Sequence, residues 1–464
     1  MRDEGFDRVV AIGMLATVAA AAGLEGGVVP MYGGVAFAAA LAVAVVWFLR
    51  RGVAGIPRLA AVGLLLVGLV LVYQALPIPP GLRAIVAPGQ ARWMDAVAPE
   101  WSGDLDRWLG EVARYDVLAA VGMAGDWTFD ALDGSHATAW RPGAIAPDAW
   151  RWALGQLLTM GVVWFVGIGL GRSHTGTRTV LIGMVLLALG EAMFGFANRN
   201  GPSTGIGVKT YQLGSVTGTF INRGHLAAFL ALGVGALWGL AASHFPLLPE
   251  EVRQHQKRTR RSSQPPSVFE ASGDKIPRLM FLAVLAAVLL VAIVASQGRG
   301  PTVGLAVAGL AIGGWIARTR PDQRFHLGIA ATLPVVGAVL AVAAFGIGGA
   351  FGRFRGMLSG DGSVTARIDL WRDSARAWLD APVFGAGLGD WQLAHALRES
   401  PVHLFSFSNA HDEPVEILVE MGVVGAVGWG LVALSAARGA RVALREVPHD
   451  DNSAAGVGAL VAVC

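Results

Sequence analysis

Cysteine is almost absent from this sequence, because Cys464, the last of the 464 residues, is its only one. A single cysteine excludes an intrachain disulfide and a metal site built from several thiolates. Charge is also scarce: Asp, Glu, Lys and Arg make up 15% of the chain, whereas soluble proteins carry about a quarter. A chain with so few charges is predicted to have lipid rather than water as its main solvent.

Long apolar runs fill most of the sequence, and apolar residues make up 54% of it. A helix that crosses a hydrocarbon core of about 30 Å needs roughly 20 such residues, because each backbone polar group must bond within the segment. Runs of this kind lie near 9–25, 29–49, 58–77, 152–171, 177–197, 224–243, 279–297, 302–317, 325–346 and 413–437. Residues 1–464 are therefore predicted to form one integral membrane domain, an all-α polytopic transmembrane bundle of about eleven spans.

The eleventh run begins near 453 and reaches Cys464 after about 12 residues, too few for a span. We therefore expect the natural chain to continue.

Basic residues predict the orientation, since cytoplasmic connections collect Lys and Arg. With the N-terminus in the cytoplasm, the loop 244–278 becomes a basic cytoplasmic loop, and the three long segments 78–151, 198–223 and 347–412 become outer loops. The basic residues lie between apolar runs, so the formal net charge of +3 favours membrane orientation over nucleic-acid binding.

One outer loop contains an amphipathic pattern that ends before Pro382. Its apolar face comprises Ile368, Trp371, Ala375, Trp378 and Leu379, and its charged face comprises Arg367, Asp369, Arg372, Asp373, Arg376 and Asp380. Such a helix is predicted to lie at the bilayer surface.

Four basic or titratable residues lie where an outer loop meets a span: Arg223, His225, Arg299 and His411. Arg299 occupies a very short turn between two apolar helices, where an ionisable group is costly and indicates function, unless its side chain only extends to the interface. Arginine suits phosphate oxygens because its fork donates paired hydrogen bonds. His411 precedes Asp412 and Glu413, which favour a basic imidazole suited to a general base.

Three other patterns have simpler structural explanations. His395, His403 and His411 recur every eight residues, but Pro401 interrupts any helix that would align them for zinc. Asp104 and Asp106 form a lone Asp-x-Asp, better explained as the acidic start of an amphipathic helix. The segment 384–390 is rich in glycine and is either an anion nest or a flexible turn after Pro382. No metal and no cofactor are predicted.

The order of several short motifs resembles the O-antigen ligase and polymerase superfamily over roughly 150–435. The motifs are 218–225, Gly-Thr-Phe-Ile-Asn-Arg-Gly-His; 297–300, Gln-Gly-Arg-Gly; Arg367 to Trp371; 382–387, Pro-Val-Phe-Gly-Ala-Gly; and His411. The most specific piece is His411-Asp412, then nine residues, then Gly422-Val423-Val424-Gly425, similar to the family's His-[Asn/Ser/Gln]-x9-Gly-x-x-Gly. Asp412 and Gly224 depart from the usual residues.

The resemblance implies a bacterial inner-membrane glycosyltransferase that acts on the periplasmic side. Such an enzyme takes a glycan from undecaprenyl pyrophosphate and passes it to an acceptor hydroxyl on lipid A–core, a growing glycan or a protein. Carried over by position, Arg223 and Arg299 would hold the pyrophosphate, and His411 would be the essential histidine near the acceptor. We expect His225, Arg367 and Arg372 to contribute to substrate binding.

A ligase and a polymerase of this superfamily remain alternatives. A secondary transporter is the main rival class, but Glu191 is the only clear carboxylate well inside a predicted span and no repeated halves are visible. A structural envelope protein would leave Arg299 unexplained.

Overall fold

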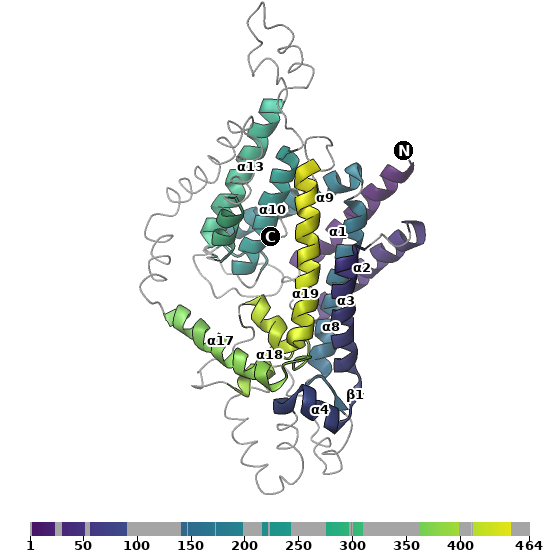
Figure 1. The fold of residues 1–464 in the computed structure, drawn as a ribbon. Helices are drawn as coiled ribbons and strands as arrows, with labels where there is room; N and C mark the ends of the chain where they lie inside the picture. The colour runs from purple at the N-terminus through teal and green to yellow at the C-terminus, as the bar shows by residue number, and fades with distance from the viewer. Residues whose placement is uncertain are drawn as a thin grey trace, which may run out of the picture. The chain divides into compact units, whose positions relative to one another are not determined.

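A computed structural model describes residues 2–23, 30–51, 56–90, 141–145, 147–171, 173–197, 216–220, 223–242, 275–296, 298, 300–309, 362–398, 410 and 412–446. These residues are overwhelmingly helical, and the only strands among them are the two-residue β1 (Pro77–Ile78) and β2 (Arg141–Pro142), which pair antiparallel. The helices are α1 (Arg2–Gly23), α2 (Pro30–Arg51), α3 (Arg58–Ala75), α4 (Pro80–Val86), α8 (Pro147–Leu170), α9 (His174–Ala197), α10 (Arg223–Ala242), α13 (Lys275–Ser296), α17 (Gly362–Asp380), α18 (Trp391–Ala396) and α19 (Glu413–Glu446) (Figure 1).

The predicted helical fold is confirmed, whereas the count of about eleven spans is not. Five described helices are long and apolar enough to cross a membrane: Arg58–Ala75, Ala149–Leu170, His174–Ala197, Arg223–Ala241 and Glu413–Gly439. Shorter apolar stretches occupy Ala38–Arg50, Met280–Ser296 and Gly300–Gly309. The predicted spans 325–346 and 453–464 lie outside the described residues.

The chain divides into two compact units. Unit 1 comprises Met1–Ala54, Leu158–Gly356 and Gly439–Cys464, and its core is formed by α9, α10 and α13. Gly233 of α10 allows this close packing, because a Cβ there would come within 2.5 Å of Ala188 and 3.1 Å of Leu289. Small residues at helix contacts are how membrane helices approach closely.

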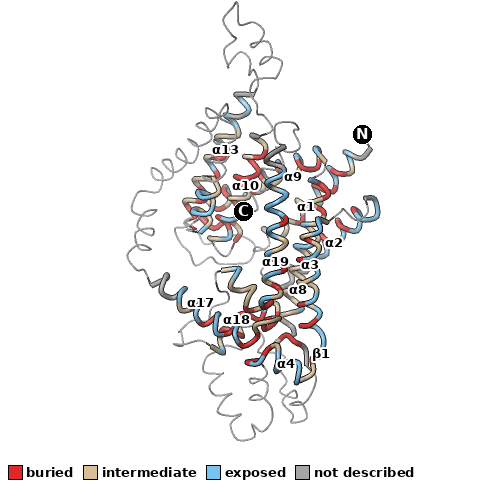
Figure 2. Tube along the Cα trace, viewed as in Figure 1, coloured by how far each residue is buried: buried red, intermediate tan, exposed pale blue. Residues whose placement is uncertain are grey.

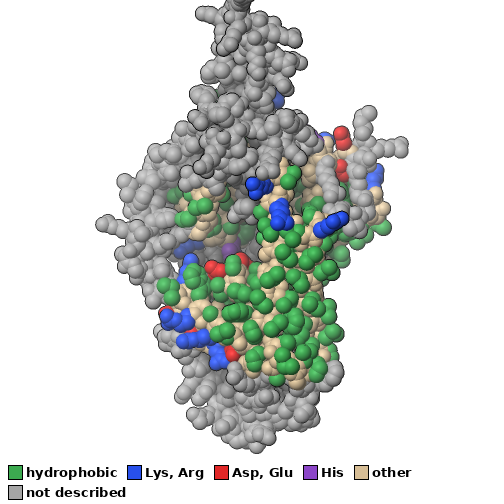
Figure 3. All heavy atoms as spheres, in the orientation of Figure 1, with side chains coloured by type: hydrophobic (Ala, Val, Ile, Leu, Met, Phe, Trp, Pro, Cys, Tyr) green, Lys and Arg blue, Asp and Glu red, His purple; other side chains and the backbone are tan. Residues whose placement is uncertain are grey.

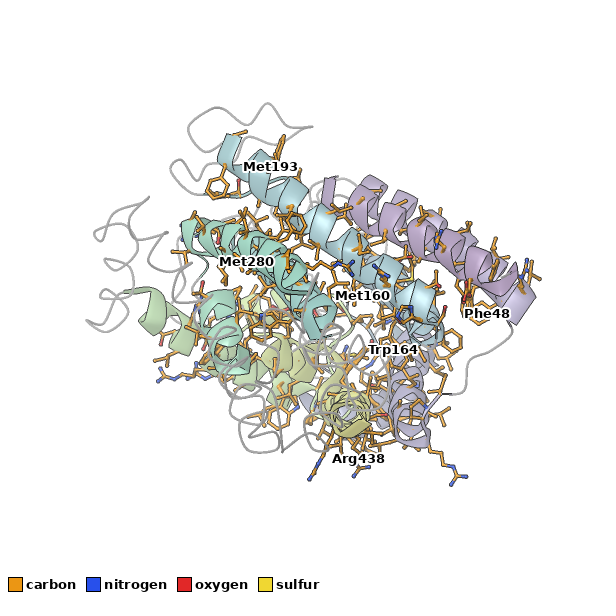
Figure 4. All side chains as sticks on the ribbon, turned by 90° about the horizontal axis from the view of Figure 1, so that it is seen from above. Phe48, Met160, Trp164, Met193, Met280 and Arg438 are labelled. Atoms are coloured by element: carbon orange, nitrogen blue, oxygen red, sulfur yellow. The ribbon has the colours of Figure 1, made fainter. Side chains whose placement is uncertain are left out.

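Large apolar side chains also cover the outside of unit 1. Met160, Met193 and Met280, all labelled in Figure 4, are each more than 60% exposed to solvent in the isolated chain. Exposure of this kind on α8, α9 and α13 is what a lipid-facing surface requires, because lipid tails are as apolar as the side chains.

Unit 2 comprises Gly55–Leu157 and Met357–Arg438. In it α3 and α19 touch through glycines, since a Cβ at Gly63 would lie 2.5 Å from the carbonyl oxygen of Gly428. The surface over these helices is largely hydrophobic (Figure 3). Parts of the first and third predicted outer loops lie together at one end of unit 2: Ile145 donates a backbone hydrogen bond to Ala386, 2.9 Å long.

The amphipathic helix predicted before Pro382 is present as α17, but its faces differ in part from the prediction. Ile368, Trp371 and Leu379 are exposed as one stripe. Trp378 is only half-exposed, because it packs on a buried cluster with Leu370 and Trp391 and donates to the carbonyl of Pro382.

The prediction that all the acids of α17 lie on its charged face is wrong, because two of them point inward. Asp373 and Asp380 are 0% and 4% exposed. Asp380 accepts two hydrogen bonds from Arg398, 2.5 and 2.6 Å long, which raise the pKa of that guanidinium above its usual value. This paired fork fixes the end of α17 against the chain that follows α18.

Candidate active site

Arg223 is the first residue of α10 in unit 1. The turn that precedes it is hydrogen-bonded to the carboxylate of Glu191 on α9. Glu191 accepts hydrogen bonds from the backbone N–H of Thr219 (2.9 Å) and from the Thr219 hydroxyl (2.8 Å). Gly218 adopts a φ of 61°, and a Cβ there would lie 2.5 Å from the Glu191 carboxylate. Glu191 therefore binds the turn 217–219, which explains the carboxylate inside this span.

Gly298, the residue before Arg299, lies against the same end of α10. A Cβ at Gly298 would lie 2.7 Å from the Cβ of Ala227 and 3.5 Å from the carbonyl oxygen of Arg223, so only glycine fits there. The Gly298 N–H donates to the Ser296 hydroxyl, and its carbonyl accepts from Thr302. The backbone beside Arg299 thus adjoins the first turn of α10, while Arg299 itself lies outside the described residues.

Removing the Glu191 carboxylate is expected to loosen the turn before Arg223. Glu191→Ala should lower the free energy of unfolding by about 2 kcal/mol, because two hydrogen bonds to a carboxylate are lost. Glu191→Gln retains an acceptor oxygen and should cost less. Thermal unfolding of the three purified proteins in one detergent checks this ranking, and equal stability of all three would contradict it.

In unit 2 the helix α19 is broken at Gly422, which has a φ of 65° and a ψ of −171°. After the break, Val423 donates to the carbonyl of Pro382 and Val424 to that of Val383. Before it, the carbonyls of Val419 and Glu420 accept from Ala386 and Gly387. The first glycine of the family-like Gly-x-x-Gly therefore interrupts α19, and backbone groups on both sides of the break form hydrogen bonds with the segment that contains the glycine-rich loop.

The glycine-rich segment 384–390 is neither a flexible turn nor a nest available to an outside anion. All seven backbone N–H groups from Gly385 to Trp391 donate to acceptors of the chain itself. The N–H groups of Gly389 and Trp391 donate to the carboxyl group of Glu420, so the acceptor held in this loop is a side chain of α19.

Gln74, near the end of α3, joins this loop to three helices. Its amide nitrogen donates to the carbonyls of Phe384 (2.8 Å) and Glu420 (2.7 Å). Its amide oxygen accepts from the Trp150 indole and the Leu388 N–H, both at 3.0 Å. The side chain is fully buried, and these four bonds use its whole hydrogen-bonding capacity.

Replacing Gln74 by leucine is expected to destabilise unit 2 by about 3 kcal/mol or more, because four groups around this side chain each lose a hydrogen bond at similar side-chain volume. Val72→Ala is the matched control, since Val72 lies on the same helix and is 53% exposed. Thermal unfolding of both variants tests the role. A Gln74→Leu protein as stable as the control would show that these bonds contribute little.

The residues on either side of His411 are fixed to the first turn of α19. Ala410 is fully buried, and its N–H donates to the Glu416 carboxylate at 2.7 Å. The Asp412 carboxylate accepts from the Val415 N–H at 3.2 Å, as an N-cap residue does. The Asp412 that departs from the family pattern therefore begins the helix, while His411 itself lies outside the described residues.

The other predicted site residues are exposed. His225 lies on the first turn of α10, and Arg367 and Arg372 lie on α17. Arg223 belongs to unit 1 and the neighbours of His411 belong to unit 2, so the convergence of Arg223, Arg299 and His411 stays a prediction.

The rejected zinc alternative involves His395, which is 3% exposed and stacks on Trp391 in the core of unit 2. His403, Asp104 and Asp106 lie outside the described residues. Within the described ranges no group of three or more His, Cys, Asp or Glu side chains could hold a metal ion.

Sequence reasoning missed Gln74, Glu416 and Glu420. The available signal was their position as polar residues in or beside apolar runs, where each needs an internal partner.

Five described apolar helices of spanning length are the features of a polytopic membrane protein. Residues 283–430 match the family model described as O-antigen ligase. This segment carries Arg299, α17, the glycine-rich loop, His411 and the break at Gly422, and its match supports the predicted resemblance to the O-antigen ligase/polymerase superfamily. No curated protein and no solved structure matches the chain.

The family consists of glycosyltransferase-like ligases and polymerases. The match therefore supports a membrane enzyme of polysaccharide biosynthesis whose substrates are lipid-linked glycans.

Proposed function

We propose that the protein transfers a glycan from undecaprenyl pyrophosphate to an acceptor hydroxyl at the periplasmic face of the bacterial inner membrane, as an O-antigen ligase does. The observation that carries the proposal is the contact between the Gly298 turn and the first turn of α10. This contact places Gly298, the residue before Arg299, beside the helix that begins with Arg223.

Two arginines at a loop–span junction suit a lipid diphosphate. The polyprenyl chain would lie along the apolar helices, and the diphosphate would lie at their ends, where Arg223 and Arg299 bind its oxygens. As the bond between the anomeric carbon and the diphosphate oxygen breaks, negative charge grows on the leaving group. Fixed guanidinium groups stabilise that charge without a metal ion.

His411 is the proposed general base. The acceptor oxygen attacks the anomeric carbon while the imidazole takes the hydroxyl proton. A new bond between the acceptor oxygen and carbon replaces the broken one, and undecaprenyl pyrophosphate leaves. A single displacement of this kind inverts the anomeric configuration. Glu416 and Asp412 fix the backbone on either side of this histidine.

The alternative within the family is a polysaccharide polymerase, which uses the same donor but extends a glycan. Deletion of the gene in the native host, with analysis of surface glycans by length and attachment, distinguishes the two. A ligase deletion leaves full-length glycan on the carrier lipid and none on the acceptor. A polymerase deletion leaves single units attached to the acceptor. An unchanged glycan profile would contradict both.

The transporter alternative loses its main candidate residue. Glu191 is bonded to the turn before Arg223 rather than presented to a transport pathway.

A further inference from the structure

The buried face of α17 fixes the orientation of the helix about its own axis. Asp373 and Ser374 are both 0% exposed, and Ala377 is 1% exposed. The Ser374 hydroxyl accepts from the Trp391 indole at 3.1 Å and donates to the carbonyl of Leu370 at 2.7 Å. With this face packed on α18, the opposite face of α17 must point away from unit 2.

The outward face is an apolar stripe without a protein partner among the described residues. Ile368 is 50% exposed, Trp371 39% and Leu379 60%, and Ala375 between them is exposed as well. These residues follow one another at the three- and four-residue spacing of a helix face. Figure 2 shows the exposed and buried sides along the helix. A stripe of this kind is costly in water and is expected to contact another apolar phase.

Arginines flank this stripe on both sides. At 100° per residue Arg367 lies beyond Trp371, while Arg372 and Arg376 lie on the other side of Ile368 and Leu379. The Arg372 and Arg376 side chains are 61% and 50% exposed, whereas their ion-pair acids Asp369 and Asp373 are 26% and 1% exposed. Figure 3 shows basic side chains beside hydrophobic ones in this region. Two of the three acids of α17 are therefore buried, whereas its arginines are exposed.

We propose that α17 binds the surface of a bilayer rich in anionic phospholipid. The apolar stripe would enter the boundary between headgroups and acyl chains, and the three arginines would extend to the headgroup phosphates. The outward charge is positive on both edges, so the surface complements anionic lipid rather than a zwitterionic one. A chain of this class already lies in a membrane, so the bilayer surface is within reach of its outer loops.

This inference concerns the membrane and does not depend on glycosyl transfer. It gives Arg367 and Arg372 a phospholipid phosphate as ligand, in place of the substrate predicted from the sequence. The two ligands share the same phosphate chemistry, so an experiment has to separate the bulk lipid from the donor.

The chain has a single native cysteine, so one substitution leaves a background in which a new cysteine can be labelled alone. In a Cys464→Ser background, Leu379→Cys is labelled with an environment-sensitive fluorophore, and the purified protein is placed in nanodiscs. Quenching by nitroxides on the acyl chains reports lipid contact, and quenching by aqueous iodide reports exposure to water. The nanodiscs contain phosphatidylcholine with an increasing fraction of phosphatidylglycerol. Arg372→Gln/Arg376→Gln is compared with Arg58→Gln/Arg438→Gln, which removes the same charge from exposed positions on α3 and α19.

We expect acyl-chain quenching to rise with the anionic fraction. For Arg372→Gln/Arg376→Gln the fraction needed should increase on the order of tenfold, because each cation near the surface contributes to binding. The control pair should leave it unchanged. Quenching by iodide alone would overturn the proposal, as would equal lipid quenching at every anionic fraction. An arginine effect that appears only when a polyprenyl diphosphate is added to phosphatidylcholine discs would overturn it too, because the arginines would then belong to the donor site.

Discussion

Replacing Gly422 by alanine is expected to abolish the folding of the glycine-rich loop onto α19. An alanine at a φ of 65° costs about 1–2 kcal/mol in backbone strain. Its Cβ would also overlap the carbonyl of Val383 and the N–H of Gly385. To relieve this overlap the loop must move away and lose the hydrogen bonds from Val423 and Val424, each contributing about 1 kcal/mol.

The expected result is a loss of about 3–4 kcal/mol in the free energy of unfolding, measured by thermal denaturation and by the yield of monodisperse protein. Gly430→Ala is the matched control, because Gly430 lies in the same helix and a Cβ there meets nothing within 4 Å. That change should stabilise the helix by up to about 1 kcal/mol. If both alanine variants behave like the unchanged protein, the break at Gly422 is not what fixes the loop.

The apolar runs predicted the helices well because hydropathy depends on local composition alone. The runs 58–77 and 177–197 correspond to α3 and α9 within a few residues. The break in α19 could not be predicted in this way, since the run 413–437 reads as one continuous span. Its cause is the chain at 382–387, which bonds to the helix at the break.

The exposed side of α17 shows where a helical pattern stops being informative. The spacing of Ile368, Trp371 and Leu379 correctly placed them on one face. A periodic pattern assigns every acid to the polar face, yet Asp380 is buried because Arg398, 18 residues later, binds it with two hydrogen bonds. Partners distant in the sequence thus decide which charges point inward.

The candidate site was predictable only as separate motifs. The sequence identified Arg223 and Arg299 as residues at loop–span junctions but not which turns adjoin. In the structure these contacts form at Gly218 and Gly298. Each glycine lies so close to a neighbouring helix that a side chain there would block the contact. Gln74 had no motif, and its role depends on four partners from three other parts of the chain.

The two family arginines and the histidine are expected to fail in different ways. His411→Ala should reduce transfer by on the order of a hundredfold to ten-thousandfold with donor binding retained, because only proton removal from the acceptor is lost. Arg299→Ala should weaken donor binding and reduce transfer on the order of a hundredfold or more, because the leaving diphosphate loses a fixed cation. Transfer and donor binding are measured separately on purified protein in nanodiscs with a polyprenyl-diphosphate-linked glycan.

Arg178→Ala provides the control for loss of positive charge, since Arg178 is exposed on α9 at the end of that helix away from Glu191. It should leave both measurements unchanged. Full activity of Arg299→Ala would contradict the mechanism. So would a structure that places His411 more than about 15 Å from both arginines, because one diphosphate-linked sugar could not then reach the base and the cations together. Both outcomes bear on the same requirement: the base and the cations must act on opposite sides of one anomeric carbon.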